Sequence, residues 1–314
     1  MEQQIQSPAI AYSLTTTAIC KFVALAVCVN KEAIKRGGEA AANPPLEIYD
    51  AVCADDGYGL LVDKEFTKNY TVKYNILVKE KDKNNSDVFS YFGFVAVSNN
   101  NNDCVIAFRG TQNTYEIEKD KDVAPVLFDS RDRECGQVPR GFHDIFINAY
   151  AVPINFSKDF RYPLNDFALH LLRHIDDVNY KAITMTGHSL GAIMATYFTA
   201  FAASAQSYDF HLYTFASPKT GDDKFAYFFP SYILTESIRV VNEMDDVPNR
   251  PNKQDIDFDY THITSQKLSF TSDGDLSIKS GNICAHQLPV YLYLLEGSKN
   301  PDILKVKNFE DCKK

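Results

Sequence analysis

The chain of 314 residues has no tryptophan, no block of basic residues and no apolar run long enough to cross a bilayer. Its 41 acidic and 32 basic side chains give a formal net charge of -9. A nucleic acid partner would require a basic surface, so this balance argues against one. The longest apolar stretch, residues 18–29, carries Lys21 and is shorter than the roughly 20 residues of a membrane-spanning helix. We therefore predict no transmembrane span.

The N-terminal region also lacks the basic start of a secretory signal peptide, because its first charged residue is Glu2. We predict instead that residues 1–45 form a helix and a loop packed on the rest of the chain. A cleaved leader is the alternative. The sequence therefore leaves the cellular compartment undecided and does not exclude secretion.

The seven cysteines include no C-x-x-C pair and no cluster with histidine at zinc spacing. Their spread fits buried thiols as well as one or two disulfides. Asp166, His170 and His174 follow one another at a helical turn and could share a face. Without a further ligand to complete a metal site, we expect a solvated helix face there. The sequence thus predicts no metal and no organic cofactor.

The order of the expected elements predicts an α/β fold in one domain covering residues 1–314. The apolar content of 45% is enough for a sizeable core. Adjacent antiparallel strands are expected early, and a strand-helix-strand unit, which implies parallel strands, is expected later. The expected strands are 70–80, 88–98, 104–110, 181–187 and 210–217, with a further strand within 237–248 that ends in acidic residues and a late hairpin over 260–270 and 276–280. The expected helices are 162–178, 192–205 and 287–297.

One serine stands between two glycines where a β-branched run gives way to an apolar helical run, in TMTGHSLGAIMA, residues 184–195. By chance, G-x-S-x-G is expected on the order of 0.1 times in such a chain, so its position between strand and helix carries the argument. A sharp strand-to-helix turn exposes the serine hydroxyl and aims the next backbone N–H at a reacting carbonyl. We predict Ser189 as a nucleophile and the Leu190 N–H as an oxyanion donor.

Four stretches in order make the chain resemble the class 3 lipases, a family of α/β-hydrolases that includes fungal triacylglycerol lipases. They are CVIAFRGT, TMTGHSLGA, LYTFASPKTGDDKFA and RVVNEMDDVP, and the resemblance covers roughly residues 88–295. It implies the α/β-hydrolase fold, with a central, mostly parallel sheet flanked by helices. In that family the residue after the FRG element supplies the second oxyanion donor, which is Thr111 here.

The resemblance also implies the remaining catalytic groups. The family's acid aligns with Asp245. Asp246 is the alternative, because it is acidic at a position where the family usually has an apolar residue. The base must follow the acid, and His262 and His286 both qualify. His262 matches a histidine of a structural strand, whereas His286 precedes the last apolar helix, where the family has its base. We predict His286, with His188 in an orienting role.

The polar segment of residues 112–134 occupies the position of the family's lid and is expected at the surface, outside the core. A lid needs an apolar face, and only Tyr115 and Ile117 offer one in its first part. The sequence does not decide whether residues 112–134 form a gating lid or a surface loop without a gating role.

The sequence therefore predicts a serine carboxylic-ester hydrolase that works through an acyl-enzyme, and the resemblance implies acylglycerol-type lipid esters as its substrates. Its expected partners are the lipid or ester substrate and, transiently, a lipid interface. Within the class, a phospholipid or small-ester hydrolase and an acyltransferase are alternatives, because loops set the pockets. A hydrolase fold retained as a non-catalytic binding protein is the alternative from another class.

Overall fold

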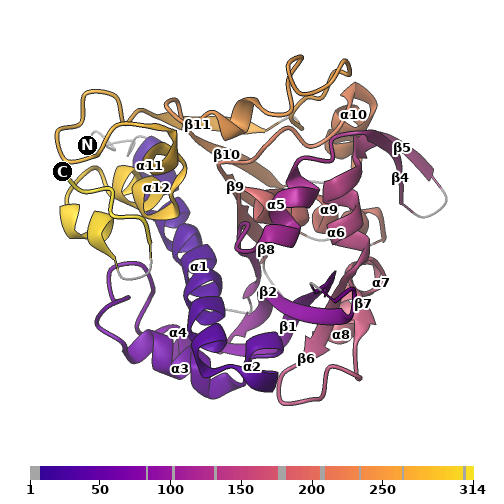
Figure 1. Ribbon diagram of the computed structural model, residues 1–314, viewed down its shortest axis with the longest axis horizontal. Coiled ribbons are helices and arrows are strands. Elements are labelled where there is room, and N and C mark those ends of the chain that lie inside the picture. The colour runs from indigo at the N-terminus through magenta and orange to yellow at the C-terminus, as the bar shows by residue number, and fades with distance from the viewer. Residues whose placement is uncertain are drawn as a thin grey trace, which may run out of the picture.

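The computed structural model describes residues 8–82, 84–100, 103–130, 133–175, 182–205, 209–232, 235–263, 265–306 and 309–314. Its centre is a mixed nine-stranded sheet in the order β11-β10-β9-β8-β3-β2-β1-β6-β7 (Figure 1). The strands of this sheet are β1 Tyr70–Lys81, β2 Asp87–Ser98, β3 Asp103–Phe108, β6 Ala149–Pro153, β7 Tyr162–Pro163, β8 Ala182–His188, β9 Phe210–Phe215, β10 Glu236–Asn242 and β11 Gln266–Phe270. A second, two-stranded sheet consists of β4 Pro125–Ser130 and β5 Arg133–Pro139.

Helices lie on both faces of the large sheet. They are α1 Pro8–Arg36, α2 Gly38–Ala42, α3 Leu46–Ala54, α4 Phe66–Asn69, α5 Thr114–Asp120, α6 Arg140–Ile147, α7 Leu164–Leu169, α8 Leu171–His174, α9 Leu190–Ala205, α10 Asp223–Tyr232, α11 Asn282–His286 and α12 Leu288–Leu295. Two short 3-10 helices, η1 Val247–Asn249 and η2 Pro301–Lys305, complete the set. One apolar core lies under α1, α3 and α12, and a second lies under α6, α7 and α9.

The strands β3, β8, β9, β10 and β11 run parallel to one another, whereas β1, β2 and β6 pair antiparallel. Parallel strands place their carboxyl ends at one edge of the sheet, where ligand sites of α/β folds form. The predicted α/β-hydrolase fold is thus confirmed, and its parallel half is the part that matters for the site.

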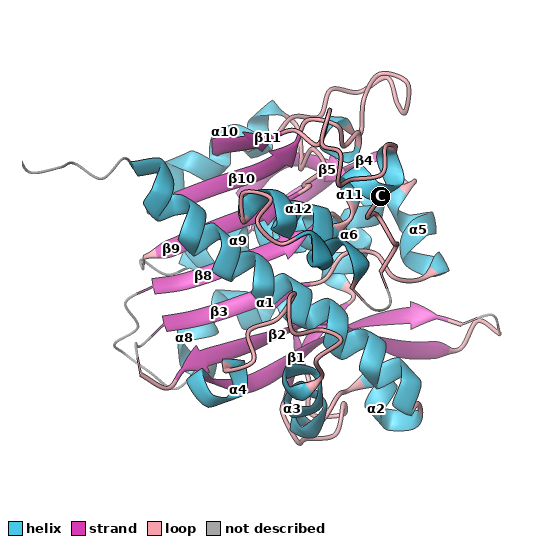
Figure 2. Cartoon of the chain, turned by 90° about the vertical axis from the view of Figure 1, so that its left-hand side faces the viewer, coloured by secondary structure: helices cyan, strands magenta, loops and turns pink. Residues whose placement is uncertain are grey.

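The N-terminal region forms the long helix α1, which lies across the sheet beside β3 and β8 (Figure 2). Residues 23–30 are buried on every side of this helix, because the sheet packs against one face and α12 against another. Among the described helices, none combines the length and the apolar character needed to cross a membrane. That residues 1–314 constitute one domain remains our proposal.

The predicted helix over residues 162–178 is interrupted in the structure. It divides into α7 and α8 at His170, whose backbone has φ -117 and ψ 21. The His170 N–H is shared between the carbonyls of Asp166 and Phe167, which tightens the last turn of α7. The His174 ring then stacks on Phe167, with 4.6 Å between centroids. Residues 176–178 lie outside the described residues.

The predicted late hairpin is wrong. Among the described residues of that region, only Gln266–Phe270 form a strand, which pairs in parallel with β10 at the edge of the sheet. Residue Ile278 instead makes an isolated bridge with Lys313. A sheet edge exposes unpaired backbone N–H and C=O groups, and residues Gln266–Phe270 satisfy those of β10 by adding a further parallel strand.

The prediction that residues 112–134 lie outside the core is also wrong in part. Phe128 is fully buried, and its ring lies 5.0 Å from both the Tyr197 ring of α9 and the Phe225 ring of α10. Burial of aromatic surface contributes strongly to the stability of a core. The hairpin of β4 and β5 therefore belongs to the second core, although its flanking residues are polar.

Candidate active site

The GHSLG segment forms a sharp turn from β8 into α9. Ser189 at its apex has a φ of 56°, a left-handed conformation that side chains rarely adopt. A Cβ on Gly187 would stand 2.1 Å from the Gly191 carbonyl oxygen, and one on Gly191 would stand 2.4 Å from the Arg109 carbonyl oxygen. Both glycines are therefore required by close backbone contacts, which push Ser189 out over the edge of the sheet.

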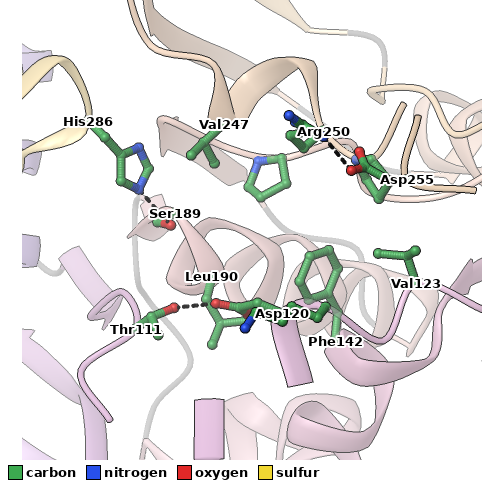
Figure 3. A pocket seen from close by; sticks show the side chains of 13 residues that line it. Thr111, Asp120, Val123, Phe142, Ser189, Leu190, Val247, Arg250, Asp255 and His286 are labelled. Atoms are coloured by element: carbon green, nitrogen blue, oxygen red, sulfur yellow. Dashed lines mark hydrogen bonds and ion pairs between the residues drawn. The ribbon is translucent and has the colours of Figure 1, made fainter. Parts of the chain in front are cut away.

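Three side chains from distant parts of the chain form a line of hydrogen bonds at this edge. The Ser189 Oγ lies 3.0 Å from His286 Nε2, and His286 Nδ1 lies 2.8 Å from Asp245 Oδ2. His286 is the last residue of α11, and Asp245 follows the end of β10. Figure 3 shows His286 pointing at Ser189 across the mouth of a cavity. This is the arrangement in which an imidazole can take a proton from a hydroxyl.

The carboxylate of Asp245 is only 2% exposed, yet it is well provided with donors. Besides His286, the Tyr291 hydroxyl donates to Oδ2 at 2.7 Å and the Val247 N–H donates to Oδ1 at 3.0 Å. Burial alone would raise the pKa of Asp245, but the interactions with His286, Tyr291 and Val247 lower it below its usual value. Asp245 is thus held ionised beside the imidazole.

The alternatives for the acid and the base lie elsewhere. Asp246 is exposed and accepts a hydrogen bond at 2.5 Å from Asn282. His262 hydrogen-bonds through Nε2 to the Pro248 carbonyl at 2.8 Å, in a loop and not in a strand. Burial lowers the pKa of His262 to about 4, so it is neutral at pH 7. The structure brings Asp245 and His286, and not these two residues, to Ser189.

The His188 side chain supports the predicted base, His286, by binding the backbone carbonyl of that residue. Its Nε2 donates to the His286 carbonyl at 2.8 Å, and burial lowers its pKa to about 3. An imidazole with so low a pKa is too weak a base to take up a proton near pH 7. It instead fixes the end of α11, which is also joined to the C-terminal segment by a disulfide between Cys284 and Cys312.

The predicted oxyanion donors, Thr111 and Leu190, lie beside Ser189. Leu190 is the first residue of α9, where backbone N–H groups are not used by the helix itself. The Thr111 hydroxyl donates to Asp120 Oδ2 at 2.8 Å. Burial raises the pKa of Asp120 to about 7, and within the described residues its Oδ1 has no hydrogen-bond partner. Asp120 was not predicted from the sequence.

A buried ion pair fixes the loop that carries Thr111. The Arg109 guanidinium, 1% exposed, donates to both oxygens of Glu116, 0% exposed, at 2.9 and 2.8 Å. The Gln112 N–H donates to the same carboxylate at 2.6 Å. Moving α5 away from the site would expose or separate this pair, at a high cost in free energy. The geometry therefore argues against α5 as a gating lid.

Ser189, His286, Thr111 and Leu190 line one cavity of about 470 Å³. Part of its wall is apolar, and that part consists of Val123, Phe142, Leu190, Pro218, Val247 and Pro251. Figure 3 shows the Phe142 and Val123 side chains directed into it, with the ion pair of Arg250 and Asp255 at the far end. A cavity of this size and lining suits an extended apolar group next to the serine.

The histidines considered for a metal site face other groups. His170 Nδ1 lies 3.3 Å from Asp166, on an exposed face, and His174 packs against the rings of Phe167 and Tyr162. Across the described parts of the chain, no three His, Cys, Asp or Glu side chains are grouped as metal ligands would be.

Known proteins are similar to this chain in sequence. The family model described as Lipase (class 3) matches residues 105–255, which include the FRG segment, Ser189 and Asp245. The chain is 31% identical to phospholipase A1-II 3 of Oryza sativa subsp. indica over 174 residues, covering 49% of this chain and 40% of that protein. It is 26% identical to phospholipase A1-II 1 of the same subspecies over 255 residues, covering 72% and 62%.

Solved structures show the same fold. A triacylglycerol lipase whose catalytic centre is described as a serine protease triad superposes with a TM-score of 0.53 at 17% identity, covering 85% of this chain and 82% of that one. The native Rhizomucor miehei lipase propeptide complex gives a TM-score of 0.50 at 18% identity, covering 92% and 79%. The chain spans less than two thirds of the length of the two rice phospholipases. The sequence motifs, the family match over residues 105–255 and the fold together make this chain similar to the class 3 lipase family.

Proposed function

We propose that this protein is a lipase-type carboxylic-ester hydrolase that works through an acyl-enzyme on Ser189. The observation that carries the proposal is the continuous line of hydrogen bonds from Ser189 through His286 to Asp245. A serine hydroxyl is a poor nucleophile until a base takes its proton, and this line supplies both the base and the group that orients it.

In the first half of the reaction, Ser189 Oγ forms a bond to the ester carbonyl carbon while its proton moves to His286 Nε2. The negative charge that develops on the carbonyl oxygen is stabilised by the N–H groups of Thr111 and Leu190. The carbon–oxygen bond to the alcohol then breaks, and His286 gives its proton to the departing oxygen. Asp245 stabilises the imidazolium between these two transfers.

In the second half, a water molecule takes the place of the alcohol. His286 removes its proton, the hydroxide attacks the acyl carbon, and the proton returns to Ser189 Oγ as the free acid departs. Every step uses side chains and backbone groups of this chain, so we propose a reaction without metal or organic cofactor.

Lipid esters are the proposed substrates. The partly apolar cavity beside Ser189 suits an acyl chain, and the family and the rice relatives named phospholipases A1 favour lipid over small esters. Contact with a lipid interface is part of the proposal. Met244 and Ile283, which are 44% and 69% exposed, stand next to Asp245 and three residues before His286 in the chain. We propose that these two side chains meet the lipid surface, because apolar side chains leave water favourably there.

Labelling with a fluorophosphonate tests the nucleophile. The native protein should label, and the Ser189→Ala variant should not. Equal labelling of the two would reject Ser189. A chain-length series of p-nitrophenyl esters, measured below and above the micellar limit, then tests the lipid assignment. Preference for acetyl esters without a rise in rate at the interface would contradict it.

The base is tested by a matched pair of histidine variants. His286→Ala should lower the rate roughly 10⁴-fold, because it removes the proton acceptor. His262→Ala should leave the rate nearly unchanged and lower the thermal unfolding temperature, because it removes the hydrogen bond to Pro248. The opposite result would exchange the two roles.

A further inference from the structure

A second, smaller cavity opens on the same catalytic residues. This side pocket has a volume of about 150 Å³ and shares Thr111, Ser189 and His286 with the 470 Å³ cavity. From these residues it extends to Lys31 of α1 and to Phe309 near the C-terminus. The two cavities therefore offer an ester two different directions away from Ser189.

The side pocket is enclosed by parts of the chain that are far apart in sequence. α1 and α12 lie side by side, and the C-terminal segment is joined to α11 by the disulfide of Cys284 and Cys312 (Figure 1). Phe309 lies on this segment, and the Lys31 Nζ stands 3.6 Å from the centroid of its ring. Lys31 and Phe309 both line the pocket, and the aromatic contact stabilises the charge of the ammonium group.

The charge of the side pocket is one-sided. Of the described residues that line it, Lys31 alone carries an ammonium group, and none carries a carboxylate. His188 also lines it but is neutral, since burial lowers its pKa to about 3. Burial lowers the pKa of Lys31 to about 8, so this ammonium is still mostly protonated at pH 7. A partly desolvated ammonium attracts an anion more strongly than one in bulk water.

The sizes of the cavities assign the two halves of an ester. The acyl chain of a lipid needs the larger cavity with its apolar wall, which leaves the side pocket for the alcohol. The departing oxygen has to lie beside His286 Nε2, and His286 lines the side pocket too. A pocket of about 150 Å³ admits a polar group of a few atoms and not a second long chain.

We infer that the side pocket binds the alcohol half of the substrate, and that Lys31 selects esters whose alcohol carries an anionic group, a phosphate or a carboxylate, close to the scissile bond. This inference rests on the proposed function. Lys31 contacts the substrate in this arrangement and determines specificity, and it takes no part in the proton transfers. A lysine ammonium binds a phosphate as a compact charge without demanding one geometry.

Esters with one acyl chain and different alcohols test the inference. Octanoylglycerol phosphate, the octanoyl ester of glyceric acid and neutral octanoylglycerol are each supplied below their micellar limits, and kcat/KM is measured. The native protein should prefer an anionic ester, and the stronger of the two identifies phosphate or carboxylate. Lys31→Met should reduce the preference about 10- to 100-fold, as expected when a charged hydrogen bond is lost. Lys31→Arg should retain most of it.

Lys35→Met is the matched control, because Lys35 lies one helical turn further along α1 and contacts Tyr58 and Glu32 instead. It should leave the preference unchanged. A measurement without variants uses the native protein and neutral octanoylglycerol, with glycerol phosphate and glycerol as competitors. Glycerol phosphate should inhibit more strongly.

Equal kcat/KM for anionic and neutral esters in the native protein would overturn the inference. So would a Lys31→Met variant that loses activity toward all three esters equally, or equal inhibition by the two competitors. These outcomes leave fluorophosphonate labelling of Ser189 intact, whereas failure of the proposed function abolishes labelling itself. The two failures are therefore distinguishable.

Discussion

The left-handed conformation of Ser189 makes a prediction about stability that is separate from catalysis. Its φ of 56° is imposed by the close approach of Gly187 to Gly191 and of Gly191 to Arg109. A non-glycine residue in this conformation costs about 1 to 2 kcal/mol. Replacing Ser189 with glycine should therefore remove strain from the folded state, while replacing it with alanine should not.

The size of the effect is a difference between two opposing contributions. Glycine relieves the strain of about 1 to 2 kcal/mol, but it also gives the unfolded chain more freedom, which costs about 0.5 to 1 kcal/mol. Both variants lose the hydrogen bond to His286, so this loss cancels in the comparison. Ser189→Gly should thus be more stable than Ser189→Ala by about 0.5 to 1 kcal/mol.

Equilibrium unfolding in urea measures this difference directly, and both variants should be inactive toward p-nitrophenyl esters. Ala51→Gly in the interior of α3 is the control for glycine in an ordinary helical conformation. It should be less stable than the native protein by about 1 kcal/mol. If Ser189→Gly were no more stable than Ser189→Ala, while Ala51→Gly behaved as expected, the turn would hold no strain and the reasoning from its φ would be refuted.

Two further predictions concern groups around the site. Removal of the disulfide in a Cys284→Ser, Cys312→Ser double variant frees a loop with a separation of 28 residues, and should lower the free energy of unfolding by about 3.6 kcal/mol, measured in urea; an unchanged value would mean that the bond does not restrain the unfolded chain. Because burial raises the pKa of Asp120 to about 7, the folded protein binds more protons than the unfolded chain between about pH 4 and 7, and its stability should fall as pH rises through that range. Asp120→Asn should weaken this fall, and equal pH dependence in the two proteins would contradict the assignment.

The core of the site was predictable because its parts are local. The turn at Ser189 depends on two glycines within five residues, between a strand and a helix that are each evident from their apolar patterns. The order of the motifs left both His262 and His286 as candidates, and the resemblance to the class 3 lipases favoured Asp245 and His286, which the structure brings to Ser189. The polar hairpin after α5 was misjudged because the sequence does not reveal that Phe128 reaches the core between α9 and α10.

Residues that act through distant contacts gave no signal in the sequence. Tyr291 belongs to an apolar helical run and reads as a core residue, yet its hydroxyl reaches Asp245 across 46 positions. Arg109 and Glu116 are seven residues apart, but only the loop between β3 and α5 makes them a buried pair. Lys31 reads as one of several surface charges on the first helix until the C-terminal Phe309 is placed against it.

The sequence by itself determined the class of fold, the nucleophilic turn and the order of the catalytic residue types, because each depends on short-range patterns of polarity and backbone conformation. Only the tertiary structure decided which carboxylate and which histidine meet Ser189, what fixes the loop that carries Thr111, and where a second pocket opens. Those features depend on the packing of the helices and loops at the carboxyl edge of the sheet, which brings Ser189 and His286, 97 positions apart in the chain, within hydrogen-bond distance.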